Sequence, residues 1–401
     1  MKSEWREYLL GDLYNFSSGL SKNSKEFGFG KPFLSFKTVF NNYILPEELP
    51  DLVNSNIAEQ ERCSILKGDI FLTRTSETLD ELGMSCVALR DYPEATFNGF
   101  TKRLRPKGKQ VYPLYAAYYM RSPYFRANIN SMVSMTTRAS LNNDILSRLP
   151  IQLPTYEGQE KIGDILYSFD RKIKLNNRIN DNLYAQTRAI TKDWISESAG
   201  DYELSSLSDI ASINPETYSP KEAWKYVNYL DTSSITNGCI AEIQYITTSS
   251  EKLPSRARRK LAPNDIVFST VRPNQRHFGI ISEPLPNMLA STGFAVIRSK
   301  NPLVCNELIY LCLTENEFIE KMEQIAEQST STFPSIKPSD LGVCEIPCPK
   351  DDSSMSLTET LKSMFALIAA NQRENTYLAD MRDVLLPKLM SGEIDISSIQ
   401  F

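Results

Sequence analysis

Two polar segments carry side chains whose chemistry suits the recognition of nucleic-acid bases. Each follows a short run that contains Asp-Ile, at residues 69–73 and 265–269. Arginine can form paired hydrogen bonds with guanine, asparagine or glutamine can do so with adenine, and hydroxyl groups can hold phosphates. We predict that these segments contact DNA, the alternative being ordinary solvated loops. The candidate residues are Thr73, Arg74 and Thr75, and Arg272, Asn274, Gln275, Arg276 and His277.

A second pair of hydroxyl-rich segments suits contact with phosphates. Thr137 and Arg138 precede Ser140-Leu141, and Ser331 and Thr332 precede Ser335-Ile336. Threonine and serine also form turns and helix caps, which is the alternative for these residues. We include all four among the candidate DNA-binding residues.

Catalytic signatures are missing from the sequence. His277 is the single histidine, which leaves little room for histidine-dependent hydrolysis or metal binding. No phosphate-loop or dinucleotide-binding glycine pattern occurs, and no Pro-Pro dipeptide of the kind that amino-methyltransferases use to hold a base. The seven cysteines include no Cys-x-x-Cys, so we expect reduced thiols rather than zinc ligands or disulfides. We therefore predict no catalytic residues and no metal site.

Short β-rich runs and longer helical stretches alternate in the two halves of the chain. The class that this indicates is α+β, with a curved sheet and a few helices in each half. The predicted strands are 32–36, 69–73, 226–230 and 265–269, and the helical stretches are 112–129 and 303–326.

The second half of the chain repeats the first at an offset of about 195 residues. The spacing is kept over more than 40 residues, and further upstream Gly68-Asp69-Ile70 parallels Asn264-Asp265-Ile266. One fold used twice, with loops that differ, suits two readers of different targets. The clearest repeated pairs are Leu146 and Leu341, Ile151 and Ile346, Pro154 and Pro349, Asn176 and Asn371, and Asn180 and Asn375.

Each half ends in a long segment with an apolar heptad seam. We predict two long helices, the first of about 50 Å, that pair as an antiparallel coiled coil with asparagines near its middle. The alternative is a pair of core helices in a larger bundle. Pro387 is expected to disturb the last turns before Gly392. The seam residues are Ile162, Leu166, Phe169, Ile173, Asn176, Asn180 and Leu183, and Leu361, Met364, Ile368, Asn371, Asn375 and Leu378.

Composition sets the outer limits. The chain has 401 residues, 41% of them hydrophobic, and a formal net charge of −5. We predict recognition domains at 1–154 and 200–350, with long helices at 155–199 and 351–401. The acidic total means that any phosphate-facing surface is local, and the basic runs 102–109 and 256–260 are candidates for it. No signal peptide or apolar membrane span is present, so a cytoplasmic protein is expected.

The order of these features resembles the specificity (S) subunit of Type I restriction-modification systems. The resemblance extends over nearly the whole chain, although residues 357–361 depart from the motif of the first copy. The motifs that carry it are Leu149-Pro150-Ile151-Gln152-Leu153-Pro154, Gln159-Glu160-Lys161-Ile162, Phe169-Asp170-Arg171-Lys172-Ile173, Asn176-Asn177-Arg178, Ile346-Pro347-Cys348-Pro349 and Leu385-Leu386-Pro387-Lys388-Leu389.

The resemblance implies two target recognition domains that read a bipartite site in double-stranded DNA. It further implies helices that hold two modification subunits, which methylate adenine with S-adenosylmethionine, and restriction subunits that use ATP and Mg²⁺. This chain would itself hold no cofactor.

Two other functions stay open at this point. One is an S-like subunit of a methylation-only or other phage-defence complex, which the neighbouring genes would distinguish. The other is a nuclease with an unrecognised motif, which predicts metal-dependent cleavage by the isolated chain.

Overall fold

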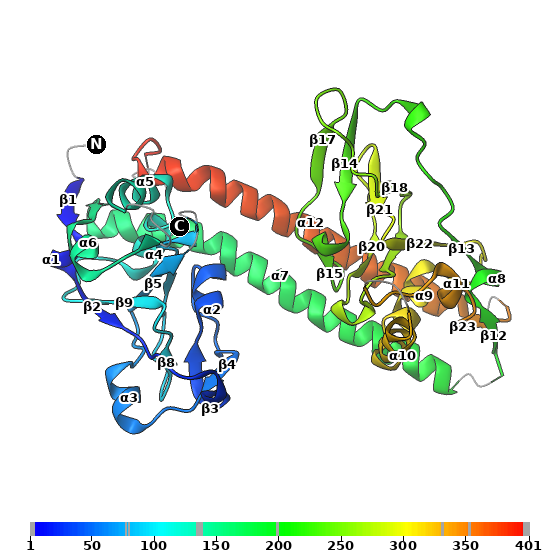
Figure 1. The fold of residues 1–401 in the computed structure, drawn as a ribbon, viewed down its shortest axis with the longest axis horizontal. Helices are drawn as coiled ribbons and strands as arrows, with labels where there is room; N and C mark the ends of the chain where they lie inside the picture. Colours follow the sequence, from blue (N-terminus) through cyan, green and yellow to red (C-terminus); the bar gives the residue numbers. More distant parts are fainter. Residues whose placement is uncertain are drawn as a thin grey trace. The chain divides into compact units, whose positions relative to one another are not determined.

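The chain forms two compact units in a computed structural model that describes residues 5–76, 78, 81–133, 139–197, 200–329, 333–351 and 354–395 (Figure 1). Unit 1 comprises Met1–Lys174 with Thr376–Phe401, and unit 2 comprises Leu175–Asn375. The boundaries between the units fall inside the two long helices, whereas the prediction gave each helix a segment of its own.

Unit 1 is built on an antiparallel sheet with the strand order β2-β9-β5-β7 and a smaller sheet with the order β4-β3-β8. Its strands are β1 (Arg6–Leu9), β2 (Tyr14–Ser18), β3 (Phe27–Leu34), β4 (Asp51–Val53), β5 (Ile70–Thr73), β6 (Thr75–Ser76), β7 (Ser85–Val87), β8 (Thr96–Phe97), β9 (Thr101–Pro106), β10 (Ala139–Ser140) and β11 (Pro150–Leu153). Its shorter helices are α1 (Leu10–Leu13), α2 (Phe36–Asn41), α3 (Ile57–Arg62), α4 (Pro113–Tyr119), α5 (Pro123–Met132) and α6 (Asn143–Arg148), with a 3₁₀ turn η2 (Ser24–Glu26).

Unit 2 contains an antiparallel sheet with the order β13-β22-β19-β20 and a mixed sheet with the order β17-β14-β21-β18. Its strands are β12 (Tyr202–Ser206), β13 (Ala211–Ile213), β14 (Tyr226–Leu230), β15 (Ile235–Thr236), β16 (Cys239–Ile240), β17 (Gln244–Thr247), β18 (Ala257–Lys260), β19 (Asp265–Ser269), β20 (Phe278–Ile281), β21 (Met288–Ser291), β22 (Phe294–Ser299) and β23 (Glu345–Pro349). Its shorter helices are α8 (Leu207–Ile210), α9 (Asn306–Leu313), α10 (Asn316–Glu327) and α11 (Pro338–Gly342), with 3₁₀ turns η4 (Pro220–Glu222), η5 (Thr232–Ser234) and η6 (Pro273–Gln275).

The two globular halves share a topology, except that the second sheet of unit 2 has one additional strand, β18. In each four-stranded antiparallel sheet the first strand in sequence, β2 or β13, pairs with the last, β9 or β22. That last strand also pairs with the strand that contains the isoleucine of the Asp-Ile pair, β5 or β19. In each second sheet one strand pairs in parallel with a later strand and antiparallel with another, as β3 does with β8 and β4, and β14 with β21 and β17. The predicted α+β class and the tandem duplication are confirmed.

Several predicted elements need correction. The strands at 226–230 and 265–269 match β14 and β19. Within the run 32–36, however, β3 ends at Leu34, and Ser35 caps α2 by accepting a hydrogen bond from the Thr38 N–H. The stretch 112–129 is two helices rather than one, because Ser122 caps a new helix and Pro123 occupies its first position. The stretch 303–326 is likewise divided between α9 and α10.

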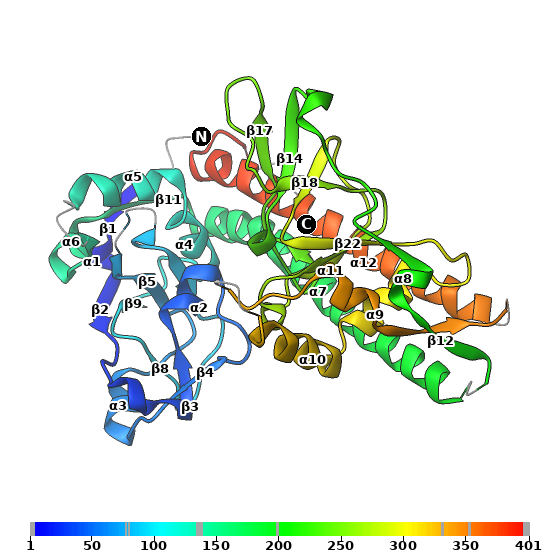
Figure 2. The same ribbon diagram turned by 45° about the vertical axis from the view of Figure 1, so that its right-hand side comes forward.

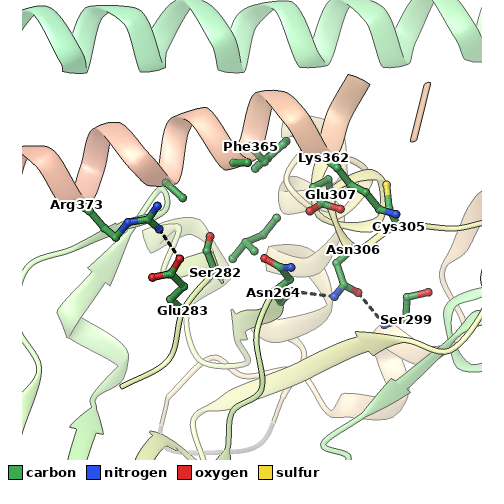
Figure 3. Close-up of a pocket in the computed structure, with 13 residues that line it drawn as sticks. Asn264, Ser282, Glu283, Ser299, Cys305, Asn306, Glu307, Lys362, Phe365 and Arg373 are labelled. Carbon is green, nitrogen blue, oxygen red and sulfur yellow. Dashed lines mark hydrogen bonds and ion pairs between the residues drawn. The ribbon is translucent and has the colours of Figure 1, made fainter. Parts of the chain in front are cut away.

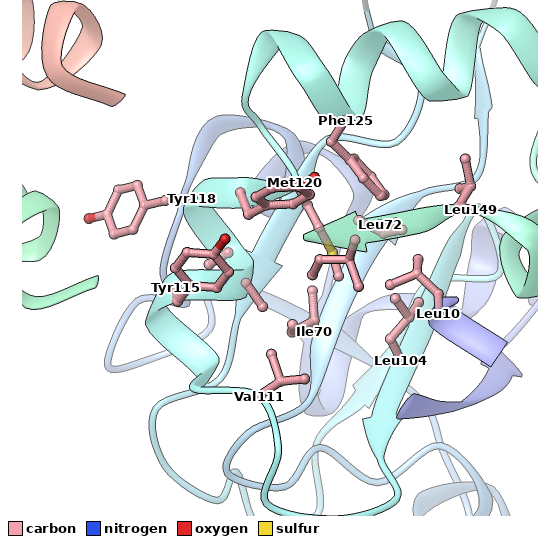
Figure 4. Close-up of a cluster of buried hydrophobic side chains, with 14 of the residues drawn as sticks. Leu10, Ile70, Leu72, Leu104, Val111, Tyr115, Tyr118, Met120, Phe125 and Leu149 are labelled. Carbon is pink, nitrogen blue, oxygen red and sulfur yellow. The ribbon is translucent and has the colours of Figure 1, made fainter. Parts of the chain in front are cut away.

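The core of unit 1 includes residues from both ends of the chain. Side chains of the sheet and of α4 are fully buried against one another, among them Ile70, Leu72 and Tyr115 (Figure 4). Leu386 and Leu389, from the end of the second long helix, belong to the same cluster. The motif Leu385-Leu386-Pro387-Lys388-Leu389 is therefore a packing element of unit 1.

The two long helices are α7 (Tyr156–Glu197) and α12 (Met355–Met390), each drawn as one unbroken helix in both views (Figures 1 and 2). In unit 1, Asp170 of α7 forms an ion pair with Arg382 of α12. In unit 2, the rings of Tyr184 and Phe365 lie 5.6 Å apart. Because residue numbers rise along one helix as those of its partner fall, the pairing is antiparallel, as predicted. Contrary to expectation, α12 continues through Pro387.

All the predicted seam residues lie in buried or half-buried positions. Polar seam residues are normally costly, so their contacts decide whether the position is satisfied. The buried ones are Ile162, Leu166, Asn176, Asn180, Leu361 and Ile368, and the half-buried ones are Phe169, Ile173, Leu183, Met364, Asn371, Asn375 and Leu378.

Asparagines of the two helices bond to each other within unit 2. The Asn176 amide donates to Asn375 Oδ1 at 2.9 Å, and the Asn371 amide donates to Asn180 Oδ1 at 2.8 Å. The repeat relates these two contacts, since it relates Asn176 to Asn371 and Asn180 to Asn375. A slip along the helices would leave these amides buried without partners, so the network favours one alignment.

No described helix is long and apolar enough to cross a membrane. All seven cysteines are free thiols, and six of them are buried or half-buried.

Candidate nucleic-acid interface

The first candidate loop, residues 73–76, is held firmly by its backbone. Arg74 lies between β5 and β6, where its N–H donates to the Phe100 carbonyl at 2.8 Å and its carbonyl accepts from Leu141 at 2.9 Å. Thr73 is fully buried, and its hydroxyl donates to the Glu81 carbonyl at 2.6 Å. This burial gives Thr73 a structural role instead of the DNA contact assigned to it from sequence.

Arg74 shares a corner of unit 1 with a buried lysine. Its guanidinium Nε is enclosed and has no hydrogen-bond partner among the described residues. Lys102 on β9 is buried and donates to Asn143 Oδ1 at 2.7 Å and to Ser18 Oγ at 2.9 Å. Desolvation, and then the charge of Arg74, lower the pKa of Lys102.

Neither of these cations forms an ion pair with a carboxylate in the part of the chain that the structure describes. Two neighbouring positive charges with neutral partners favour an anion such as a phosphate. Thr75 lies beside them, half-buried in β6 opposite Ser140. Thr137 and Arg138 lie outside the described residues, as do Ser331 and Thr332 of the second half.

The second candidate loop, residues 270–277, has an unusual backbone. Arg272 and Arg276 both adopt left-handed conformations, with φ of 49° and 56°, on either side of η6. Such conformations cost energy for residues other than glycine and are common at functional sites. The Arg272 guanidinium lies over the Phe333 ring, 5.1 Å from its centroid, and remains exposed.

The other side chains of this loop differ in their freedom to bind a ligand. Asn274 hydrogen-bonds to Glu323 on α10, and Arg276 donates to Asn316 Oδ1 at 2.9 Å. His277 Nδ1 lies 2.6 Å from the Ile235 carbonyl oxygen. Gln275 is exposed, and its side chain has no hydrogen bond to any described residue. Arg272 and Gln275 are therefore the side chains of this loop that are exposed and have no hydrogen bond to a described residue.

The two loops are not equivalent position by position. Thr270 makes the backbone bonds that Arg74 makes, to Gly293 at 2.8 Å and from Ile336 at 2.9 Å. Lys102 pairs with Leu72 across the first sheet, and the residue at the matching position of the second sheet is Ala295, which pairs with Phe268. Arg74 and Arg272 are therefore not counterparts, and the cation pair belongs to unit 1 alone.

A repeated ion pair was missed from the sequence. Arg105 grips Asp69 through two bonds of 2.8 and 2.6 Å, and Arg298 grips Asp265 through two of 2.7 and 2.9 Å. Both aspartates are buried. The repeated Asp-Ile pairs were the available signal, but which arginine faces them depends on strand register.

The two basic runs, 102–109 and 256–260, also differ in their positions within the sheets. The first run forms much of β9, a central strand, and its Lys102 and Arg103 are buried. The second includes β18, an edge strand, and Arg256 is exposed. The exposed cations of the two runs are therefore Lys107 and Lys109 in the first and Arg256 in the second.

Unit 2 contains a cavity of about 430 Å³ between α12 and the β20 side of the globular half (Figure 3). Arg373 on α12 reaches across to Glu283 with a separation of 3.0 Å, and Asn306 donates to the Asn264 carbonyl at 2.8 Å. The Arg373–Glu283 ion pair joins α12 to the globular half, and the Asn306 bond lies within that half. Throughout the described residues, no group of three or more His, Cys, Asp or Glu is placed to hold a metal.

A sequence model of the family described as "Type I restriction modification DNA specificity domain" matches residues 2–185. The Type I restriction enzyme HindI specificity subunit of Haemophilus influenzae is 22% identical over 98% of this chain and 100% of the relative. The MjaIX specificity subunit of Methanocaldococcus jannaschii is 23% identical over 86% of this chain and 83% of the relative.

The crystal structure of a Type I restriction-modification S subunit from M. genitalium superposes with a TM-score of 0.57 at 14% identity, covering 96% of each chain. The duplicated α+β architecture with two long helices is thus the fold of a Type I specificity subunit. Residues 2–185 thus match the Type I restriction modification DNA specificity domain, and the chain as a whole is similar to Type I restriction enzyme specificity subunits.

Proposed function

We propose that the chain reads a bipartite target in double-stranded DNA, one part by each globular half. The observation that carries the proposal is the shared topology of the two halves combined with loops that differ, Arg74 with Lys102 in one and Arg272 with Gln275 in the other. Two halves with a shared fold would then present different side chains to two different half-sites.

In this proposal α7 and α12 set the spacing between the half-sites and provide the surface for the other subunits. Those partners are two modification subunits, which methylate adenine, and restriction subunits. A continuous helix pair with a locked alignment is suited to be such a ruler, because its length varies little.

The experiment is to map modified adenines by long-read sequencing in host DNA, with this gene intact and deleted. Loss of methylation at one split motif on deletion is the expected result, and it would also identify the bases. Unchanged methylation, in cells shown to express the modification subunits, would contradict the proposal. A restriction gene with helicase motifs nearby separates restriction from a methylation-only complex.

Changing Arg74 to alanine is expected to weaken recognition of one half-site only. The loss of a charged interaction with a base or phosphate is about 1–3 kcal/mol. The effect is measured by comparing how the assembled complex methylates or binds targets that are mutated in one half-site or the other. Arg90→Ala removes an exposed arginine elsewhere in unit 1 and should leave recognition unchanged. Equal relaxation of both half-sites would show that the halves do not read separately.

A further inference from the structure

A second surface of unit 2, distinct from the loop at residues 270–277, combines a cluster of aromatic rings, of which Tyr245 is exposed, with cations that have no described carboxylate partner. It surrounds a cavity of about 960 Å³ at one end of β14 and β17. In both views this end of the two strands points away from α7 and α12 (Figures 1 and 2). The cavity is separate from the one that borders α12, since the two share no lining residue.

Four aromatic residues line this cavity. The rings of Tyr226 and Tyr245 are stacked, with centroids 5.3 Å apart and planes 23° apart, and Tyr218 and Trp224 lie 4.7 Å apart. Tyr245 is 62% exposed although it is a large aromatic side chain. An aromatic platform left open to water at a cavity is a surface on which a planar ligand can stack.

Cations surround the aromatic rings. Lys225, Lys252 and Arg258 line the cavity, and none of them forms an ion pair with a described carboxylate. Lys260 nearby is different, because it is paired with Glu222 at 2.6 Å. A single carboxylate, that of Glu251, lines the same cavity. The excess of positive charge stands out in a chain whose formal net charge is −5.

We propose that this cavity binds an unstacked nucleobase, with the neighbouring phosphates held by Lys225, Lys252 and Arg258. Inside a duplex the faces of the bases are covered by their neighbours, so an exposed ring such as Tyr245 can stack only on a base that has left the stack. The hydroxyls of Thr247 and Ser249 line the cavity and can bond to the edge of the base. The inference rests on the proposed function only in that the base would come from the DNA target that the chain reads.

The test uses the full chain and a single-stranded oligothymidine of about ten nucleotides as the probe. Binding is followed by anisotropy of the labelled oligonucleotide and by tryptophan fluorescence, since Trp224 lines the cavity. Tyr245→Ala is expected to weaken binding about tenfold, the scale of one base–aromatic stacking interaction. Tyr377→Ala, which removes a tyrosine 64% exposed on α12, is the matched control and should bind as the unchanged chain does.

Two further variants separate stacking from charge. Trp224→Phe should keep the affinity within a few-fold and lose the fluorescence response. The double variant Lys252→Ala and Arg258→Ala should bind more weakly. In a plot of the logarithm of the binding constant against the logarithm of the salt concentration, its slope should be shallower by about 0.7 for each phosphate that is no longer neutralised. Equal binding by Tyr245→Ala and the unchanged chain would overturn the inference, as would binding of duplex but not of oligothymidine. Normal methylation of the natural motif alongside either result would leave the proposed function standing.

Discussion

Replacing Asp265 with alanine is expected to lower the free energy of unfolding of unit 2 by about 3–5 kcal/mol. Asp265 is fully buried, accepts two hydrogen bonds from Arg298 and a third from the Ala262 N–H at 2.7 Å. Its removal leaves the guanidinium without its main partner in a partly desolvated position.

Urea unfolding followed by tryptophan fluorescence measures this change. In a Trp5→Phe background the two remaining tryptophans, Trp194 and Trp224, both lie in unit 2 and report on it alone. Glu216→Ala is the matched control, because Glu216 pairs with the same arginine at 2.9 Å but is 53% exposed. That loss should be under about 1 kcal/mol. If the two substitutions lowered the free energy of unfolding equally, the buried Asp265–Arg298 pair would not be the one that stabilises unit 2.

Removing residues 174–180 and 369–375 together is expected to shift methylation from the natural motif to one with a shorter spacer. The two segments are related by the repeat, and they contain both members of the Asn176–Asn375 and Asn180–Asn371 contacts, so no buried amide loses its partner. Each helix shortens by about 10 Å, the length of about three base pairs. Long-read mapping of modified adenines in cells that carry the variant measures the spacer.

A control for this deletion restores the length with a different sequence. Inserting a seven-residue helical segment with an apolar seam into each gap should return methylation to the natural spacing. If the shortened chain stays active at the natural spacing, the helix pair does not set the distance between the half-sites.

The architecture follows from the sequence where the signal is local or periodic. The run at 265–269 is β19, and the heptad positions from Ile162 to Leu378 all lie in buried or half-buried positions. Both patterns reflect burial along a single element, which the order of apolar and polar residues records directly.

Features that depend on pairing between distant strands could not be predicted. Lys102 looked like part of a surface run, but β9 is the strand between β2 and β5, so its side chain is buried. The equivalence of Arg74 with Thr270 likewise follows from bonds to Phe100 and Gly293, more than 20 residues away in sequence. Strand register fixes both results, and no local pattern in the chain encodes it.

The division of the helices between the units also orders events during synthesis of the protein. Unit 2 is one continuous stretch, Leu175–Asn375, and all of its core has been made before the last turns of α12 are translated. The core of unit 1 must wait for Leu386, Leu389 and Met390. The half that is synthesised first is therefore the last to receive all of its core, and a released chain that ends at residue 375 would contain the whole core of the second unit but lack three core side chains of the first.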